Sequence, residues 1–217
     1  MPLDKFGPFA DVFARGELAV PGHLELLGLH QPGAQIVISR IQRALDVGPS
    51  QHWIDALFDD PNWRPHLVGA IALILDSRQT LKPSALWRAV DAGSWVLPQL
   101  VVCAHIVDSD FPSQCRDRIR ARAPVSPVLD LSPAERHSAT GPGNVRERSS
   151  KLLASLATVG RRIPSLAPWI DEQCADPEVS TLISQDVDNA AGICEGWFVH
   201  LRNQFESRGV RLVAAAA

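Results

Sequence analysis

Tyrosine is absent from the 217 residues, and no segment alternates apolar with polar side chains for long. Alternation of that kind marks a half-buried β-strand, and aromatic residues are among those enriched in strands. The absence of tyrosine and of this alternation argues against a sheet, whereas helical periodicity is plentiful. Because 46% of the residues are hydrophobic and 21% are charged, the composition is that of an ordinary folded protein. We expect an all-α protein that forms a single domain over residues 1–217.

Long hydrophobic runs are also missing. The longest uncharged apolar stretch, residues 92–107, includes Ser94, Pro98 and His105, whereas a membrane-spanning helix needs about 20 predominantly apolar residues. The amino terminus has no apolar segment of the kind found in an export signal, because charged residues recur from Asp4 onward. We therefore expect a cytoplasmic protein without a membrane segment.

Spacings that would hold a metal or build a catalytic centre are missing as well. The four cysteines are separated by 11, 58 and 19 residues, and no two histidines are four residues apart, so no zinc or redox spacing occurs. Neither a Gly-x-Ser-x-Gly nucleophile turn nor a phosphate-binding glycine loop is present. We assign no catalytic residue, metal or cofactor. We expect reduced, structural thiols at Cys103, Cys115, Cys174 and Cys194.

Two segments, residues 51–75 and 85–107, have the pattern of one helix-turn-helix unit in two copies. Four positions correspond at offsets of 32 to 33 residues: Trp63 with Trp95, Pro65 with Pro98, Leu67 with Leu100, and Ala70 with Cys103. A period in this range is typical of stacked helical repeats, in which each helix pair buries its apolar face against the next pair. The two tryptophans are expected either to fill the wedge between stacked units or to be partly exposed binding anchors.

Local signals predict where these helices begin and end. A polar residue that can cap a helix stands before each of the four helices: Ser50, Asn62, Ser84 and Ser94. Pro65 and Pro98 each fall in a first helical turn, where a missing N–H costs little. Upstream, an apolar stripe over residues 34–45, between Gly33 and Gly48, predicts another helix.

The turn of the first unit, Asp60-Pro61-Asn62-Trp63-Arg64, lies between two short helices and precedes a helix rich in alanine and leucine. In these features residues 50–110 resemble HEAT-like repeats. The second unit differs, with Gly93 and Ser94 where the first has proline and asparagine, and Val96 where it has arginine. The resemblance implies stacked helical hairpins, within a repeat-like half over about residues 34–122. It also implies a protein that binds other macromolecules through an extended surface.

Beyond the repeat-like half, six prolines and glycines interrupt residues 123–150, which predicts a long connection in place of a helix. Helices follow over about residues 148–208: two short ones, then a long one that begins at Pro177 with Asp176 as its cap. An apolar stripe from Val179 to Phe205 predicts that this last helix runs for roughly 30 residues without a break.

Charge is distributed unevenly along the chain, whose formal net charge is −3. Residues 116–162 contain 10 of the 21 basic side chains and only 4 acidic ones, whereas no lysine or arginine occurs between Arg162 and Arg202. Seven carboxylates lie in that second interval: Asp171, Glu172, Asp176, Glu178, Asp186, Asp188 and Glu195.

Three interpretations of this asymmetry are open. The basic segment could fold against the acidic helices, or both could be solvated faces. The seven carboxylates could form a docking surface for a basic protein, because complementary potentials raise the association rate. Residues 116–162 could instead contact nucleic acid. Two observations argue against the last: the arginines between residues 116 and 122 would form two separate rows on a helix, and no aromatic residue lies between Phe111 and Trp169 to stack on bases.

We expect a non-enzymatic protein that binds a basic protein partner through the seven carboxylates. An immunity or antitoxin-type inhibitor of a toxin or effector would act in this way, because such a role requires a complementary surface and no chemistry. One alternative is a helical enzyme in which Asp186, Asp188 or Glu195 faces a cleft together with histidine. The other is a nucleic-acid-binding protein that uses residues 116–162.

Overall fold

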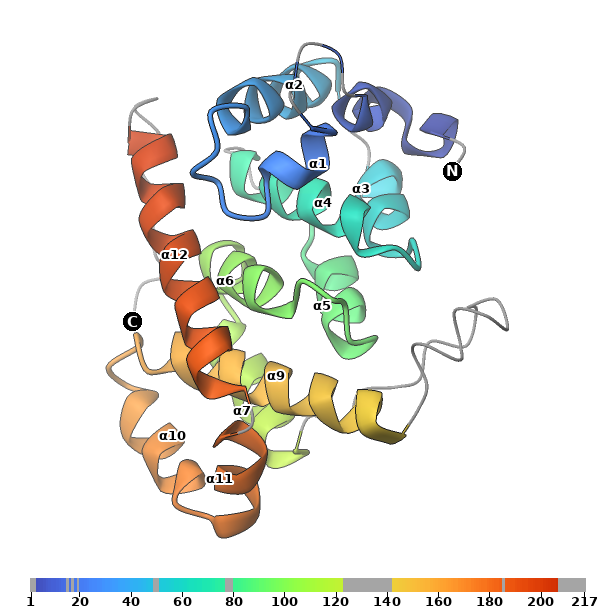
Figure 1. Cartoon of the computed structure of the whole chain (residues 1–217). Coiled ribbons are helices and arrows are strands. Elements are labelled where there is room, and N and C mark those ends of the chain that lie inside the picture. The colour runs from blue at the N-terminus through green and yellow to red at the C-terminus, as the bar shows by residue number, and fades with distance from the viewer. Residues whose placement is uncertain are drawn as a thin grey trace.

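A computed structural model describes residues 3–14, 16, 18, 20–48, 51–76, 80–122, 142–184 and 186–206, with the backbone alone for residues 3, 142–147 and 206. This part of the chain is helical and contains no strand (Figure 1). Its elements are the 3-10 helix η1 (Leu3–Phe13) and the α-helices α1 (Gly22–Glu25), α2 (Ala34–Asp46), α3 (Gln51–Phe58), α4 (Trp63–Leu75), α5 (Ser84–Asp91), α6 (Leu97–Val107), α7 (Phe111–Arg120), α9 (Pro142–Gly160), α10 (Ala167–Cys174), α11 (Pro177–Ser184) and α12 (Val187–Glu206). None of these helices is both long and apolar enough to cross a membrane.

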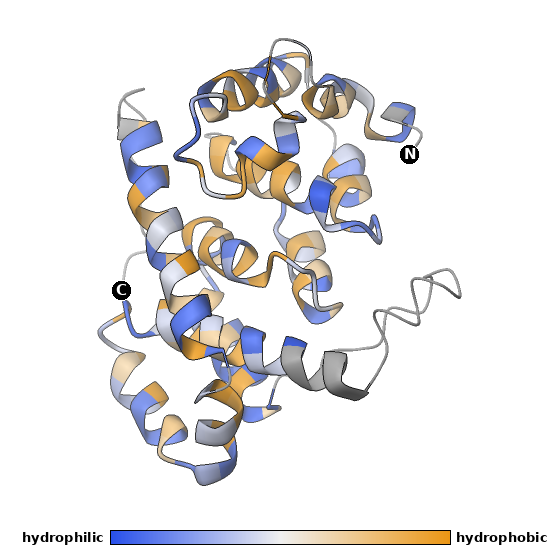
Figure 2. Cartoon of the chain, in the orientation of Figure 1, coloured by the Kyte–Doolittle hydropathy of each residue, from blue (hydrophilic) through white to orange (hydrophobic). Residues whose placement is uncertain are grey.

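Helices α4 and α6 form the centre of the molecule (Figure 1). Every residue of α4 from Pro65 to Leu75 is buried, and so is every residue of α6 from Leu97 to His105. A helix that is apolar on all sides needs neighbours on all sides, and α6 packs against α4, α5, α9 and α12. The hydropathy colouring of Figure 2 accordingly shows a concentration of apolar residues on α4 and α6.

The helices predicted to form two hairpins are α3, α4, α5 and α6, and two pairs of residues that the predicted repeat relates are in contact. The ring centroids of Trp63, at the start of α4, and Trp95, just before α6, are 4.9 Å apart. Near the middle of the helices, the Sγ of Cys103 donates to the carbonyl oxygen of Ala70 at 3.3 Å. Contact at two successive corresponding positions means that α4 and α6 run in the same direction.

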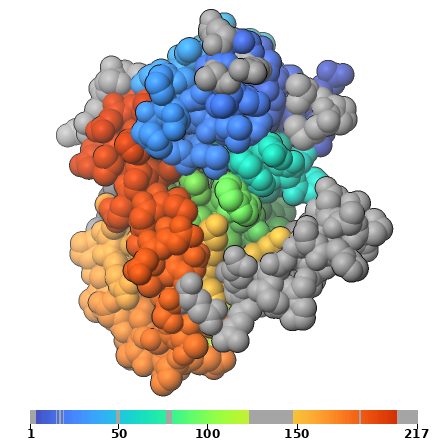
Figure 3. Space-filling model, viewed as in Figure 1, coloured from blue at the N-terminus to red at the C-terminus, as the bar shows by residue number. Residues whose placement is uncertain are grey.

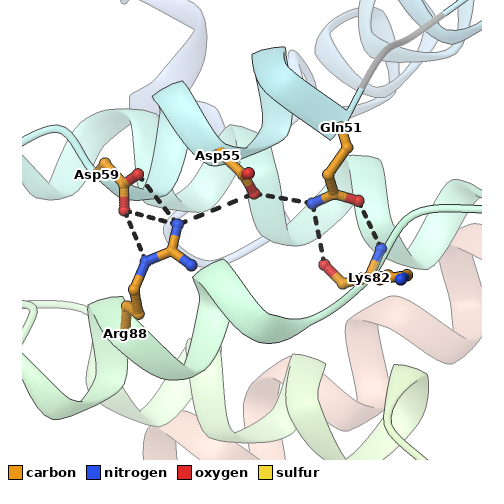
Figure 4. Close-up of polar contacts among 5 residues, drawn as sticks. All are labelled: Gln51, Asp55, Asp59, Lys82 and Arg88. Atoms are coloured by element: carbon orange, nitrogen blue, oxygen red, sulfur yellow. Dashed lines mark hydrogen bonds and ion pairs between the residues drawn. The ribbon is translucent and has the colours of Figure 1, made fainter.

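A polar seam joins α3 to α5 across the two hairpins (Figure 4). The guanidinium of Arg88 donates to both carboxylate oxygens of Asp59, at 3.1 Å from Nε and 3.0 Å from Nη2, and lies 4.0 Å from Asp55. The side-chain amide of Gln51 donates to Asp55 at 2.8 Å and exchanges hydrogen bonds with the backbone of Lys82. Gln51 and Asp55 of α3 and Asp59, just after its end, are four positions apart and therefore lie on one side of this segment.

The predicted boundaries of α2 and α4 are confirmed. Helix α2 begins after Gly33 and ends two residues before Gly48. Asn62 caps α4 through its side-chain oxygen, which accepts the backbone N–H of Arg64 at 3.1 Å. These helices follow the local signals because apolar periodicity and end signals agree there.

Two other predicted caps are wrong, and Ser50 lies outside the described residues. Ser84 is the first residue of α5, and Pro83 stands at the cap position without a capping hydrogen bond from its side chain. Ser94 stands three residues before Leu97, where α6 begins. Pro98 does lie in the first turn of α6, as predicted.

Ser94 belongs instead to a buried hydrogen-bonded link between the turns of the two hairpins. Its hydroxyl lies 2.7 Å from Nδ1 of His66, and Nε2 of His66 lies 2.8 Å from the carbonyl oxygen of Asp60. A carbonyl only accepts, so Nε2 carries a proton. Because burial lowers the pKa of His66, the ring is neutral, and its Nδ1 accepts the proton of the Ser94 hydroxyl.

The segment before residue 34, to which the sequence analysis assigned no element, forms η1 and α1. Phe6 and Phe9 of η1 are fully buried. Between them, Gly7 has φ of +49°, and a Cβ atom at this position would lie 2.6 Å from the ring of Trp53. Glycine is therefore required at position 7 for its backbone conformation and for the room that the indole occupies.

Helix α9 begins earlier than predicted. It starts at Pro142, inside the segment 123–150 that was assigned to a long connection, and runs to Gly160. Proline is well tolerated at the first helical position, so Pro142 begins the helix and does not exclude it. Leu152 and Leu156 are buried as their spacing predicts. The remainder of the predicted connection, residues 123–141, lies outside the described residues.

The last helix, predicted as one continuous element, is two helices, α11 and α12. Between them Asp186 starts α12: its backbone oxygen accepts the N–H of Ala190 at 2.9 Å, and its Oδ1 accepts the side-chain amide of Asn189 at 3.0 Å. Helix α11 packs on α9, whereas α12 crosses both α9 and α6, and one straight helix cannot follow both courses. The apolar stripe itself is buried: Val179, Ile183, Ala190, Cys194, Trp197, Leu201 and Phe205.

Helix α12 also reaches the amino-terminal elements (Figures 1 and 3). The indole N–H of Trp197 donates to the carbonyl oxygen of Leu27 at 2.9 Å, and the amide of Gln99 donates to the same oxygen at 3.3 Å. Further along α12, the amide of Gln204 donates to the carbonyl oxygen of Leu29 at 3.0 Å. These bonds fix the connection between α1 and α2 to both α6 and α12.

Candidate functional site

The seven carboxylates singled out in the sequence lie on or next to α10, α11 and the first half of α12. We call them the acidic surface. Asp171 and Glu172 are on α10, Asp176 and Glu178 are at the start of α11, and Asp186, Asp188 and Glu195 are at the start and middle of α12. All are exposed except Asp186, which is half-buried. Helices α10 and α11 and the beginning of α12 form the lower end of the molecule in Figure 1.

Three of these carboxylates face arginines of the basic segment 116–162. The pairs are Arg161 with Asp171 at 2.7 Å, Arg122 with Glu178 at 2.8 Å, and Arg162 with Glu195 through two nitrogens. The side chains of the three acids remain 62%, 63% and 51% exposed, respectively. Exposed pairs of this kind contribute about 0–1 kcal/mol to stability. They reduce the negative charge of the acidic surface without cancelling it.

Two more carboxylates act at helix starts. Oδ1 of Asp176 accepts the backbone N–H groups of Glu178 at 2.8 Å and Val179 at 3.2 Å, which confirms the predicted cap. The N–H groups of Val179 and Glu178 lower the pKa of Asp176, so this carboxylate stays ionised. At Asp186, Oδ2 is buried and has no hydrogen-bond partner in the described part of the chain.

The last two members of the acidic surface are Glu172 and Asp188. Both are exposed. Within the described residues, neither makes an ion pair with a lysine, arginine or histidine, and neither caps a helix. Removing either charge would therefore leave the internal contacts of α10 and α12 in place, which makes the two residues suitable probes of this surface.

The described basic side chains of residues 116–162 mostly contact other parts of the same chain. Arg118 donates to both carboxylate oxygens of Asp91, each at 2.7 Å, and its guanidinium lies 4.1 Å from the ring centroid of Trp87. This bidentate pair is the best shielded of the arginine pairs, because the Arg118 side chain is only 15% exposed. It binds α7 to α5.

The arginines between residues 116 and 122, which were expected to form two rows on one helix, do not all lie on a helix. Helix α7 ends at Arg120, whose guanidinium lies 5.4 Å from the ring centroid of Trp169. Arg122 has φ of +56° and lies past the end of α7. The expectation that Arg118 and Arg122 lie one turn apart on a helix is therefore wrong. Arg136 and the side chain of Arg146 lie outside the described residues.

The two corresponding tryptophans combine the two roles that the sequence allowed. Trp63, at the start of α4, and Trp95, just before α6, contact each other. Trp95 nevertheless has 60% of its surface exposed, the largest exposed aromatic side chain among the described residues. The pair therefore fills part of the space between the starts of α4 and α6 and also reaches the surface of the protein.

Among the residues named for a helical enzyme, Asp186 is half-buried at the start of α12. Asp188 and Glu195 are exposed on α12. His105 is buried, with ring centroids at 5.3 Å from Phe111 and 5.7 Å from Phe198, and burial, followed by the charge of Arg162, lowers its pKa. In the described part of the chain, no group of three or more His, Cys, Asp or Glu side chains is arranged to hold a metal ion.

The cysteines are free thiols, as predicted, and three of them are buried. Burial raises the pKa of Cys115 and of Cys194 to about 12, and it raises the pKa of Cys103 further. A neutral thiol is a poor nucleophile and metal ligand, so these side chains act as small apolar residues of the core.

The sequence allowed the basic segment to fold against the acidic helices, and three ion pairs join the two, but it did not indicate which residues would pair. The arginine partners of Asp171, Glu178 and Glu195 are 10, 56 and 33 positions away, and no local pattern relates such positions. The tryptophan contact had a signal, because Trp63 and Trp95 each follow a polar residue in the turn of a repeated unit. Corresponding positions of stacked units are the ones that meet.

Comparison of the chain with protein-family models, with curated proteins and with solved structures found no match.

Proposed function

We propose that this chain is a non-enzymatic protein-binding protein whose acidic surface receives a basic protein partner, in the manner of an immunity or antitoxin-type inhibitor. One observation supports this most directly: seven carboxylates lie on α10, α11 and α12, and only three of them face an arginine. The other four are Glu172, Asp176, Asp186 and Asp188. Their negative charge is not paired with a basic side chain among the described residues.

The arrangement suits recognition by charge. Clustered charges of one sign attract a partner of the opposite sign and raise the rate of encounter. The three paired arginines also support the proposal, because they hold Asp171, Glu178 and Glu195 in fixed positions while leaving half or more of each side chain exposed. Positions held in advance lose less conformational entropy when a partner binds.

We further propose that α3–α4 and α5–α6 are two HEAT-like repeat units, and that they serve as the scaffold on which α9 to α12 are mounted. Two observations support this: Trp63 contacts Trp95, and Ala70 contacts Cys103, each at the offset expected for copies of one unit. The buried helices α4 and α6 would then keep the acidic surface rigid without contributing to it.

The test uses the two acidic residues that make no ion pair and cap no helix in the described part of the chain. Glu172→Lys combined with Asp188→Lys reverses two exposed charges, and Asp46→Lys, on the exposed end of α2, is the matched control. Affinity capture from the native host should recover a basic protein with the wild type and with the control. Titration of that purified protein should show affinity that falls as salt rises, and at least about tenfold weaker binding to the double variant, a loss of about 1.4 kcal/mol.

Two results would contradict the proposal. One is the absence of any stable protein partner for the wild-type chain. The other is a partner that binds the double variant and the wild type equally well. Circular dichroism of each variant checks the fold, which should be unchanged because neither Glu172 nor Asp188 makes an ion pair or a helix cap in the described part of the chain.

A further inference from the structure

A second surface, separate from the acidic one, is built around Trp63 and Trp95. Trp95 is 60% exposed, and two contacts hold it: its ring lies against Trp63 at 4.9 Å between centroids, and its carbonyl oxygen accepts a hydrogen bond from Nζ of Lys151 at 2.9 Å. A preformed, exposed indole of this kind is the residue most often found at the energetic centre of protein interfaces.

The charge next to the two tryptophans is positive. The guanidinium of Arg64 lies 5.0 Å from the ring centroid of Trp63, and Nζ of Lys151 lies 5.4 Å from that of Trp95. Nη1 of Arg64 donates to the side-chain oxygen of Asn62 at 3.1 Å. Among the described residues, no carboxylate lies within ion-pairing distance of Arg64. Arg88, Arg118, Arg122, Arg161 and Arg162, by contrast, each have such a partner.

The histidine next to this surface adds no charge of its own near neutral pH. His23 is 8% exposed, and its ring meets that of Trp63 edge-on, with centroids 6.1 Å apart. Burial, followed by the charge of Arg64, lowers the pKa of His23 to about 4. Its Nδ1 is buried without a hydrogen-bond partner in the described part of the chain. The positive charge of the surface therefore comes from Arg64 and Lys151.

We infer that Trp63, Trp95, Arg64 and Lys151 form a docking surface for an acidic segment of a protein partner. An aromatic or aliphatic side chain of that segment packs on the exposed part of Trp95, and a carboxylate of the same segment binds the guanidinium of Arg64. Arginine suits this role because its planar fork of N–H donors matches the two oxygens of a carboxylate. This surface prefers a partner of the opposite charge from the one that the acidic surface attracts, so the two surfaces can be tested independently.

The geometry favours an acidic peptide over single-stranded nucleic acid. Proteins that bind single strands offer free aromatic faces on which bases stack. Here Arg64 lies over the ring of Trp63 and Lys151 over the ring of Trp95, and the two rings are tilted by 42° against each other. A carboxylate can reach the guanidinium of Arg64 without displacing either cation from its ring, and the described residues offer no row of parallel aromatic faces on which successive bases would stack.

The experiment is a selection of random twelve-residue peptides displayed on phage against the immobilised full-length chain, with the Trp95→Ala variant as the counter-selection. We expect enrichment of peptides that combine Asp or Glu with Phe, Trp or Leu. A synthetic peptide of the most enriched sequence should bind the wild type in calorimetry. Trp95→Ala should weaken this binding at least tenfold, and Arg64→Gln at least fivefold. Val47→Ala, at an apolar side chain that is 81% exposed on another part of the surface, should bind like the wild type.

The acidic surface supplies the second control. Glu172→Lys combined with Asp188→Lys should leave peptide binding unchanged, so failure of the proposed function and failure of this inference would be told apart. The inference is overturned if no peptide is enriched, if the enriched peptides are basic, or if they bind Trp95→Ala as well as the wild type. Unchanged thermal unfolding of Trp95→Ala would show that a loss of binding is not a loss of fold.

Two other occupants have their own measurements. Sedimentation velocity that shows self-association of the wild type, lost in Trp95→Ala, would assign the surface to a second copy of this chain and overturn the inference. Tight binding of a twelve-nucleotide oligothymidylate that Trp95→Ala abolishes would assign it to nucleic acid, with the same consequence. Monomeric protein that does not bind the oligonucleotide and binds the acidic peptide would support the inference.

Discussion

Helices α4 and α6 and the helices of the acidic surface use the same secondary structure in opposite ways. From Pro65 to Leu75 every residue of α4 is buried, whereas α10 buries only Ile170, and α11 buries only Val179 and Ile183. The central helices have almost no exposed face that a partner could contact, whereas α10 and α11 bury few side chains in the core. Burial is therefore concentrated on α4 and α6 and exposed charge on α10 and α11, and substitutions in the two regions should differ accordingly.

The largest effect is expected at the centre. Leu100 of α6 is fully buried, and Leu100→Ala should lower the free energy of unfolding by about 2–5 kcal/mol, because it removes buried methyl groups and leaves a cavity. Chemical denaturation monitored by circular dichroism measures the change. Glu172→Gln on the acidic surface is the control and should stay within about 0.5 kcal/mol of the wild type. A loss at Leu100 no larger than that of the control would contradict the contrast between the two regions.

A smaller effect is expected from acid, through the buried histidines. The pKa of His23 is about 4 in the folded protein and 6.5 in the unfolded chain, so only the unfolded state takes up the proton between these values. This contribution to stability is complete above pH 6.5 and is lost as the pH falls toward 4, by up to about 3 kcal/mol. The lowered pKa values of His66 and His105 act in the same direction.

Urea unfolding at pH 7, 6 and 5 tests the acid effect. The His23→Gln variant should lose less stability than the wild type over this range, and His52→Gln, on the exposed face of α3, should follow the wild type. Equal pH dependence for His23→Gln and the wild type would show that His23 does not contribute to the loss of stability in acid.

The smallest effect is expected on the acidic surface itself. A double-mutant cycle with Arg161→Gln and Asp171→Asn should give a coupling energy of about 0.2–1 kcal/mol, because the Asp171 side chain is 62% exposed and solvent screens the pair. Equilibrium unfolding at low and high salt measures it, and the coupling should shrink as salt rises. A coupling of several kcal/mol would mean that the acidic surface stabilises the fold as much as the centre does, and the comparison would fail.

The elements that sequence reasoning predicted well are those with local signals that agree. Helices α2, α3 and α5 have apolar periodicity, α4 and α6 are apolar along their length, and Asn62 caps α4 with its side chain. Prediction failed where a distant contact decided. The hydroxyl of Ser94 accepts the backbone N–H of Val96 at 3.4 Å, but α6 begins only at Leu97, and the same hydroxyl is bonded to the buried ring of His66. The predicted final helix has an unbroken apolar stripe, but it divides at Asp186 because α11 and α12 follow different neighbours.

The candidate surfaces were predictable to different degrees. The composition of the acidic surface could be read directly, since no basic residue interrupts the seven carboxylates along the chain. Which of them are paired could not, because Arg122 and Glu178 are 56 positions apart. The surface around Trp63 and Trp95 was foreshadowed by the spacing of the repeat, but the arrival of Lys151 from α9 was not.

The sequence by itself determined that this protein is helical and where α2 and α4 begin and end, because those properties depend on residues within one or two turns of each other. It also determined that negative charge concentrates near the carboxy-terminal end. Only the tertiary structure decided which charges are left unpaired and which indole reaches the surface. Those properties depend on which helices become neighbours, and burial and pairing across tens of residues are settled when the chain packs.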